Sequence, residues 1–189
     1  MAISKWFKWP KKQREPMSAE TAAAMLMFQC DKREDLSEFP DLSEAQVQAI
    51  GDLSYLTKVA FVLYWLNGAA QRAQFMERAQ TILTLFQIIF GPESFKEGGT
   101  DDSKQSAKYI AALAADTFEL VDFVERTSTD HPDYCPRMME WCKGWLARID
   151  GSESTSRVIS DRYGVPLAAI LLGELANLRR TLASTMENA

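Results

Sequence analysis

The feature that most constrains the fold is a proline-free run of apolar and helix-forming residues from Ser43 to Gly91. As one α-helix this run would be about 70 Å long, at about 1.5 Å per residue. A compact domain of 189 residues has a radius of gyration of only about 16 Å. The run must therefore fold back on itself. Asn67-Gly68 is the favoured place, since both residues tolerate a left-handed helix cap, and Gly51 is a second candidate.

Start and stop signals divide the rest of the chain into further helices. Ser18 precedes an alanine-rich segment as an N-cap, and Ser43 with Gln46 forms a capping-box pattern. No segment shows the alternation of a β-strand. The sequence predicts an all-α, single-domain bundle of six or seven helices. We expect these helices over about 19–33, 44–66, 69–90, 104–126, 136–149, 154–162 and 166–185.

Apolar stripes at helical spacing predict the core of this bundle. The helices on either side of Asn67-Gly68 should pack through Phe61, Tyr64 or Trp65 on one and Phe75, Ile82 or Phe86 on the other. The last helix should be internal. Its buried residues should include Leu167, Leu171 and Leu178.

Charge is distributed unevenly along the chain. The net charge is −5, but residues 1–14 carry +5 and no acid, so the remainder carries −10. Three cysteines cannot pair completely, and no secretory signal is recognisable, which predicts a reduced, cytoplasmic protein. The most apolar runs, 59–66 and 82–90, are too short to span a bilayer, and we expect them to be buried helix faces.

Residues 1–17 are expected to form a short, mobile basic tail, and residues 18–189 the helical domain. Aromatic rings alternate with cations in the tail, a composition suited to the headgroup region of an anionic membrane or to an acidic protein surface. Single-stranded nucleic acid is a third target of this chemistry. A tail that only adds solubility, or aromatics folded back on the helical domain, would have the same composition. The candidate docking residues are Lys5, Trp6, Phe7, Lys8, Trp9, Lys11, Lys12 and Arg14.

Residues 156–182 suggest a second hypothesis. A short helix, then Tyr163-Gly164-Val165, then another helix resembles the helix-turn-helix spacing of bacterial regulators. A recognition helix presents polar and basic residues near its N-terminus. Here the first turns, 166–172, are apolar and fit a core better than a DNA groove.

A third hypothesis comes from acidic residues at every third position: Asp116, Glu119, Asp122 and Glu125. Glu119 and Asp122 have a spacing that resembles half of the metal motif of all-α nucleotide pyrophosphohydrolases. That resemblance implies magnesium bound by Asp116, Glu119 and Asp122, because a hard cation prefers oxygen ligands. The second half of the motif is missing upstream, where Lys96 follows Glu93 and Gln80 follows Glu77. A solvated helix face gives the same pattern.

The sequence as a whole favours binding over catalysis. We expect a non-catalytic intracellular adaptor or regulatory protein that uses protein-protein contacts and no cofactor, with its tail at an anionic membrane or acidic surface. That places it in the cytoplasm, with the inner face of a membrane as a peripheral site. A nucleic-acid-associated regulator and a magnesium-dependent nucleotide pyrophosphohydrolase are the alternatives. The sequence leaves open whether the protein forms a homo-oligomer.

Overall fold

The computed structural model describes residues 17–32, 36, 39–90, 117–127, 130–149 and 153–187. Within these residues all regular secondary structure is helical, and the chain is an all-α bundle. The helices are α1 (Ala19–Asp31), α2 (Glu44–Ala70), α3 (Met76–Phe90), a helical segment over 117–126, α5 (Tyr134–Ile149) and α6 (Glu153–Glu187). The all-α class predicted from the sequence is confirmed.

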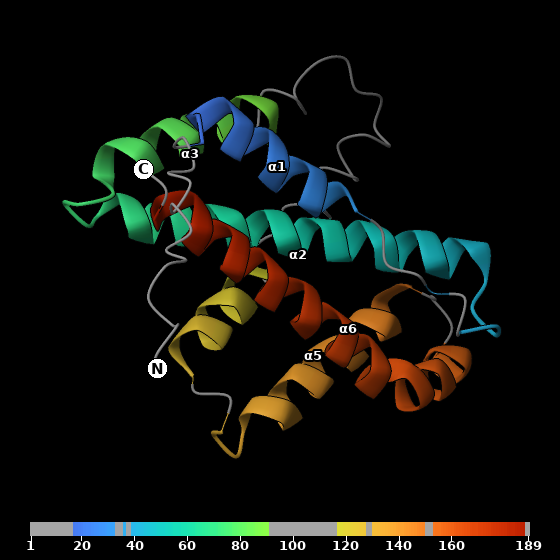
Figure 1. Ribbon diagram of the computed structural model, residues 1–189. Coiled ribbons are helices and arrows are strands. Elements are labelled where there is room, and N and C mark those ends of the chain that lie inside the picture. Colours follow the sequence, from blue (N-terminus) through green and yellow to red (C-terminus); the bar gives the residue numbers. More distant parts are fainter. Residues whose placement is uncertain are drawn as a thin grey trace, which may run out of the picture.

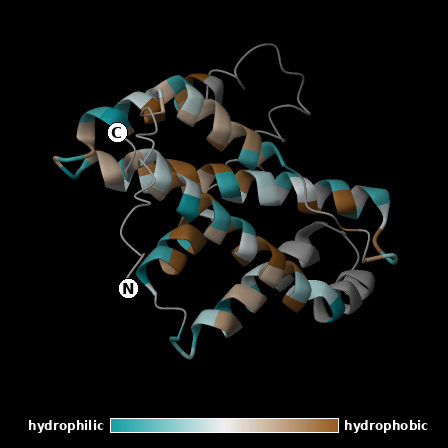
Figure 2. Cartoon of the chain, in the orientation of Figure 1, coloured by the Kyte–Doolittle hydropathy of each residue, from teal (hydrophilic) through white to brown (hydrophobic). Residues whose placement is uncertain are grey.

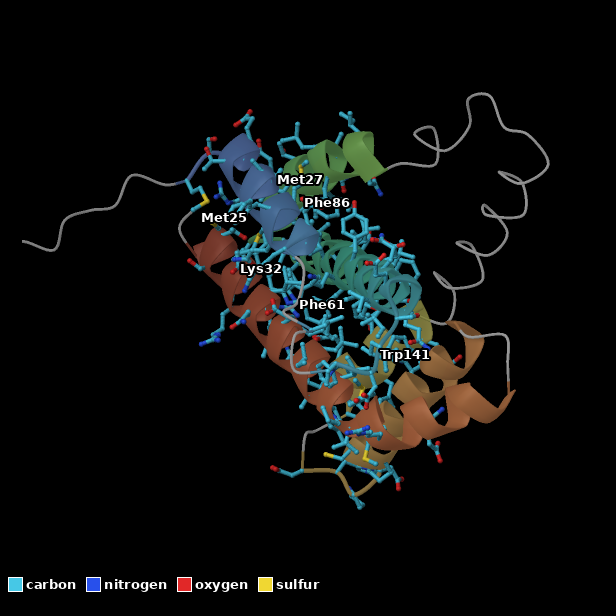
Figure 3. The ribbon with its side chains drawn as sticks, turned by 90° about the vertical axis from the view of Figure 1, so that its right-hand side faces the viewer. Met25, Met27, Lys32, Phe61, Phe86 and Trp141 are labelled. Atoms are coloured by element: carbon cyan, nitrogen blue, oxygen red, sulfur yellow. The ribbon has the colours of Figure 1, made fainter. Side chains whose placement is uncertain are left out.

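The long α2 runs through the middle of the bundle (Figure 1). Helices α1 and α3 pack together along one side of it, and α6 crosses it with α5 packed alongside. Hydrophobic residues follow the interior of α2 and α6, whereas the turn between α2 and α3 is hydrophilic (Figure 2). Phe61 of α2 and Phe86 of α3 lie in this interior, as Figure 3 shows.

The N-caps form as the sequence indicates. The Ser18 hydroxyl accepts a hydrogen bond from the backbone N–H of Thr21 at 3.2 Å. Ser43 and Gln46 make both hydrogen bonds of a capping box, so the chain leaves the preceding loop and enters α2 in a defined direction. These caps satisfy N–H groups that have no partner inside the helix.

The main core also follows the predicted stripes. Phe61, Ile82 and Phe86 belong to one buried cluster, against which Tyr64, Trp65 and Phe75 pack. Leu171 and Leu178 are buried in the same cluster. Leu167 is buried in a second, smaller cluster with Leu36, Phe39, Ile50 and Tyr163, where the loop after α1 meets α2 and α6.

The chain reversal after α2 lies later than predicted. The helix continues through Asn67 and Gly68 to Ala70, and the turn occupies 71–75. Ala69 is buried in the main cluster, which favours one further helical turn. The C-cap residue Gln71 has φ −81° and ψ −9°, so the helix ends without the left-handed residue on which the prediction depended.

The final helix corrects a second prediction. Residues 153–187 form one helix, with Pro166 inside it, in place of two helices separated by a turn. Tyr163 and Leu167 flank the proline and pack in the same buried cluster, so packing on both sides holds the helical path. Pro166 still removes one backbone N–H from the helix. The two helices separated by a turn, on which the resemblance to a helix-turn-helix over 156–182 depended, are therefore a wrong prediction.

Among the described helices, α2 alone is long and apolar enough to cross a bilayer, over Gln46–Ala70. The prediction that every apolar run is too short does not hold for this longer window. Of its most apolar part, 56% is buried inside the protein. Length and composition do not separate a spanning helix from a core helix, and we interpret α2 as the central core helix because α1, α3 and α6 pack on it.

Candidate functional site

The tail residues predicted to dock on a surface lie outside the described residues, which begin at Met17. They are Lys5, Trp6, Phe7, Lys8, Trp9, Lys11, Lys12 and Arg14, and their role stays a prediction. The structure does describe where the tail joins the bundle. Met17 packs, half-buried, against the main cluster at the start of α1.

Helices α1 and α3 begin at the same end of the bundle. Arg78 in the first turn of α3 donates from Nη2 to the carbonyl oxygen of Met17 at 2.6 Å. Its Nε donates to the carbonyl oxygen of Thr185 near the end of α6, also at 2.6 Å. One guanidinium thus joins three segments, and both helices run away from this common end (Figure 1).

Two large apolar side chains stand exposed on this pair of helices. Phe28 of α1 is 74% exposed and Ile88 of α3 is 70% exposed, more than any other large hydrophobic residue described. Phe28 is eleven residues beyond Met17 and Ile88 ten beyond Arg78. Each is therefore about 15 Å along its helix from the common end. Single exposed hydrophobics are ordinary, but two at a similar distance along a pair of contacting helices make this pair the candidate contact surface.

Exposed charges of both signs border this helix pair, with Lys32 four residues after Phe28 and Arg72 in the turn before α3. Helix α1 contains no Lys or Arg, and the one cation of α3 is Arg78, which is engaged with Met17 and Thr185. We call this surface the α1/α3 face. Its exposed residues are Glu20, Thr21, Ala24 and Phe28 of α1, and Glu77, Thr81, Thr84 and Ile88 of α3.

Two of the three residues proposed as magnesium ligands, Glu119 and Asp122, lie in the segment 117–126 with Glu125, and each carboxylate contacts a different cation. Glu119 lies 3.8 Å from Arg137 of α5. Asp122 accepts from Arg126 at 2.6 Å and from the hydroxyl of Tyr64 at 2.7 Å. Glu125 is paired with Arg179 of α6. These contacts are those of carboxylates that join helices.

Asp116, the third proposed ligand, lies outside the described residues. Within the described part of the chain, no three His, Cys, Asp or Glu side chains are grouped so as to hold a metal ion. Because Glu119 and Asp122 point to separate arginines, the structure does not bring them together as ligands. The magnesium hypothesis therefore gains no support from the described residues.

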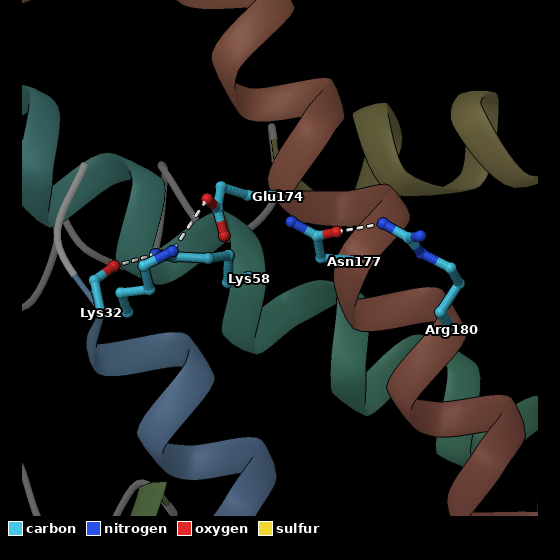
Figure 4. A network of polar contacts seen from close by, with 5 residues as sticks. All are labelled: Lys32, Lys58, Glu174, Asn177 and Arg180. Carbon is cyan, nitrogen blue, oxygen red and sulfur yellow. Dashed lines mark hydrogen bonds and ion pairs between the residues drawn. The ribbon is translucent and has the colours of Figure 1, made fainter. Parts of the chain in front are cut away.

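A cavity of about 170 Å³ opens where the C-terminal end of α1 meets α2. It has acidic, basic and apolar walls. Its lining residues are Cys30, Asp31, Lys32, Gly51, Asp52 and Tyr55. The Asp52 carboxylate accepts a hydrogen bond from the side chain of Gln48 at 2.7 Å. The Lys32 ammonium lies 3.6 Å from Glu174 of α6, as Figure 4 shows.

A buried lysine lies behind this cavity. Lys58 of α2 is only 1% exposed, and its ammonium donates to the carbonyl oxygen of Lys32, the C-cap of α1 (Figure 4). The C-terminal end of a helix carries a partial negative charge, which favours a cation there. Helix α1 has no basic residue in its last turn, so a neighbouring helix supplies the cation.

Cys30 shares this environment but is held in its protonated form. Burial raises the pKa of the Cys30 thiol from 9.0 to about 12, and nearby Lys58 only partly opposes the rise. Since the thiolate is the nucleophilic form, this cysteine is a poor nucleophile near neutral pH. The cavity therefore lies at a helix junction whose cysteine is not activated.

Sequence reasoning missed the α1/α3 face, although one signal for it existed. The buried residues of α1, Ala22, Ala23, Leu26 and Cys30, form one stripe. Phe28 is two positions after Leu26, about 200° around the helix, and so falls opposite that stripe. No comparable signal marks Lys58, because its burial depends on where the end of α1 is placed.

Comparison of the chain with models of protein families, with curated proteins and with solved structures found no match.

Proposed function

We propose that this protein is a non-catalytic intracellular adaptor whose α1/α3 face binds a protein partner. The observation that supports this is the exposure of Phe28 and Ile88 on two helices that share one end. Large apolar side chains that become buried on association supply most of the binding free energy at an interface. The face has room for such contacts because threonine and alanine surround both residues.

The exposed apolar side chains define the chemistry of the partner. Charges of both signs border them: Glu20 and Glu77 are exposed at the common end, and so are Arg72 before α3 and Lys32 at the end of α1. A partner segment with aromatic or aliphatic anchors therefore fits the face through apolar contact.

The basic tail contributes the second part of the proposal. We infer that it attaches the adaptor reversibly to an anionic surface at the inner face of a membrane. Each cation near such a surface adds about 1 kcal/mol of attraction. Co-sedimentation with phosphatidylserine vesicles should fall when salt is raised and in the Trp6→Ala, Trp9→Ala double variant. Equal sedimentation with neutral vesicles would contradict this part.

The face is tested by selecting helical peptides from a display library on the full chain. Enriched peptides should carry aromatic or aliphatic anchors, and their binding should fall at least about tenfold in Phe28→Asp and Ile88→Asp, since each loses an anchor worth about 1.4 kcal/mol or more. Val165→Asp is the matched control, because Val165 is also exposed but lies on α6. Peptides that bind all three variants as well as the wild type would reject the face.

A further inference from the structure

We propose that the first half of α6, residues 153–165, opens as a unit separately from the rest of the bundle, with Pro166 as its hinge. A latch formed by Asp41, Arg162 and Tyr163 holds this half in its described position. The device would operate whether or not the α1/α3 face binds a partner.

Asp41 accepts hydrogen bonds from two consecutive side chains of α6. The guanidinium of Arg162 donates to Oδ2 of the Asp41 carboxylate, and the hydroxyl of Tyr163 donates to the same oxygen at 2.9 Å. The Arg162 guanidinium also lies 5.3 Å from the centroid of the Tyr163 ring. Phe39 meets that ring edge to face, with 5.0 Å between the two centroids. The latch therefore connects the chain before α2 with the turn of α6 that precedes the proline.

The segment that presents Asp41 is held by its own hydrogen bonds. Residues 39–42 form a turn in which the backbone N–H of Leu42 donates to the carbonyl oxygen of Phe39 at 3.2 Å. Pro40 occupies the second position of this turn, for which its fixed φ is suited. Ser43 then caps α2. Because this side of the latch is fixed to α2, we expect the first half of α6 to be the side that moves on release.

Pro166 makes α6 easier to bend here than at other positions. It lacks the backbone N–H that would donate to the carbonyl oxygen of Arg162, and its ring crowds that carbonyl group. Sharp kinks in helices occur mainly at such prolines and at a few other local features. The Pro166 side chain is exposed, so its packing does not oppose a change of angle.

The two halves of α6 contribute to different parts of the core. Among the α6 side chains that the structure describes, 162–186, the members of the main cluster begin at Leu171, whereas Tyr163 belongs to the smaller cluster. Helix α5 also packs along α6, and its described buried residues, Tyr134 and Met138, belong to the main cluster. Withdrawal of Tyr163 would open the smaller cluster and leave the main one in place. Opening of this half should therefore need less free energy than unfolding of the bundle.

Hydrogen exchange of the backbone amides, measured on the full chain by mass spectrometry, tests the latch, because exchange reports how often each segment opens. In the wild type, residues 157–165 should exchange several-fold faster than residues 171–182 of the same helix. Asp41→Ala should accelerate exchange over 157–165 several-fold further and leave 171–182 and α3 unchanged. Tyr163→Phe, which removes only the hydroxyl, should give a smaller change with the same pattern. Asp52→Ala, which removes another exposed aspartate, is the matched control and should alter neither half of α6.

Pro166→Ala tests the hinge apart from the latch. Alanine restores the backbone donor at this position, so exchange over 157–165 should slow several-fold, toward the rate of 171–182. Equal exchange of the two halves in the wild type would overturn the proposal. So would an effect of Asp41→Ala that is confined to 39–43 or spread evenly over the bundle, and so would unchanged exchange in Pro166→Ala.

Discussion

The hydroxyl of Tyr64 donates a hydrogen bond of 2.7 Å to Oδ1 of Asp122, joining α2 to the segment 117–126. The same carboxylate accepts from Arg126 at 2.6 Å, one helical turn away. Asp122 was a candidate magnesium ligand on sequence grounds. Its two described partners instead give it the role of a connection between helices.

Removing this hydrogen bond should lower the stability of the fold. We expect Tyr64→Phe to reduce the free energy of unfolding by about 1 kcal/mol, because the acceptor is charged but partly exposed to water. A double-mutant cycle with Asp122→Ala, which removes the acceptor, should show a coupling of about 0.5–1 kcal/mol by urea denaturation. Glu119→Gln, on the same helix but exposed, should stay near the wild type. Additive losses would contradict a direct bond.

The buried ammonium of Lys58 gives a second prediction. Lys58→Met keeps most of the apolar stem but leaves the carbonyl of Lys32 without this donor. We expect the free energy of unfolding to fall by about 1–3 kcal/mol. Lys32→Met, which removes only the exposed ammonium near Glu174, serves as the control and should change little. A variant as stable as the wild type would show that Lys58 contributes through its stem alone.

Leu171 tests whether α6 is internal. It is 4% exposed and lies in the main cluster. Leu171→Ala should therefore cost about 2–5 kcal/mol through lost burial and a residual cavity. Val165→Ala on the same helix, where the side chain is exposed, should cost less than about 0.5 kcal/mol. Similar losses in thermal or urea unfolding for both variants would contradict the described packing.

We expect the Cys30 thiol to react slowly with thiol reagents in the folded protein. At pH 8 a thiol reagent should modify the exposed Cys135 quickly and the buried Cys30 only on unfolding, because burial both shields Cys30 and raises its pKa to about 12. Peptide mapping by mass spectrometry distinguishes the cysteines. Modification of Cys30 at the rate of Cys135 would show that the cavity beside it opens readily.

The raised pKa of the Cys30 thiol also predicts how the stability of the fold depends on pH. The folded-state pKa of about 12 lies above the ordinary value of 9.0, so folding favours the protonated thiol. The stabilisation that this thiol gives the folded state is complete below pH 9 and is lost as pH rises toward 12, since the Cys30 thiol ionises first in the unfolded chain. Stability measured across this range should fall less steeply in Cys30→Ala than in the wild type.

The sequence predicted those parts of the fold that depend on local chemistry. The caps at Ser18 and Ser43 require only a side chain and the backbone three residues on, and both form. The stripes that contain Phe86 and Leu178 reflect helical spacing, and both residues are buried. Such features can be read without knowing which helices are neighbours.

The features that were missed depend on tertiary contacts. Gly68 and Pro166 favour breaks locally, but the burial of Ala69 and of Tyr163 with Leu167 keeps both segments helical. The α1/α3 face becomes visible only when α1 and α3 are seen to start at one end. The burial of Lys58 likewise needs the end of α1 to lie against α2.

Arg78 lies where the first and last helical segments of the described chain come close together. Because one guanidinium holds the carbonyls of both Met17 and Thr185, the path from α1 to α6 returns almost to its origin. A linker of a few residues could join these two points, and the exposed turn at 71–74 could then be opened, since exposed turns accept new chain ends. In such a permuted chain α3 would come first and α2 last, with the packing of the bundle unchanged.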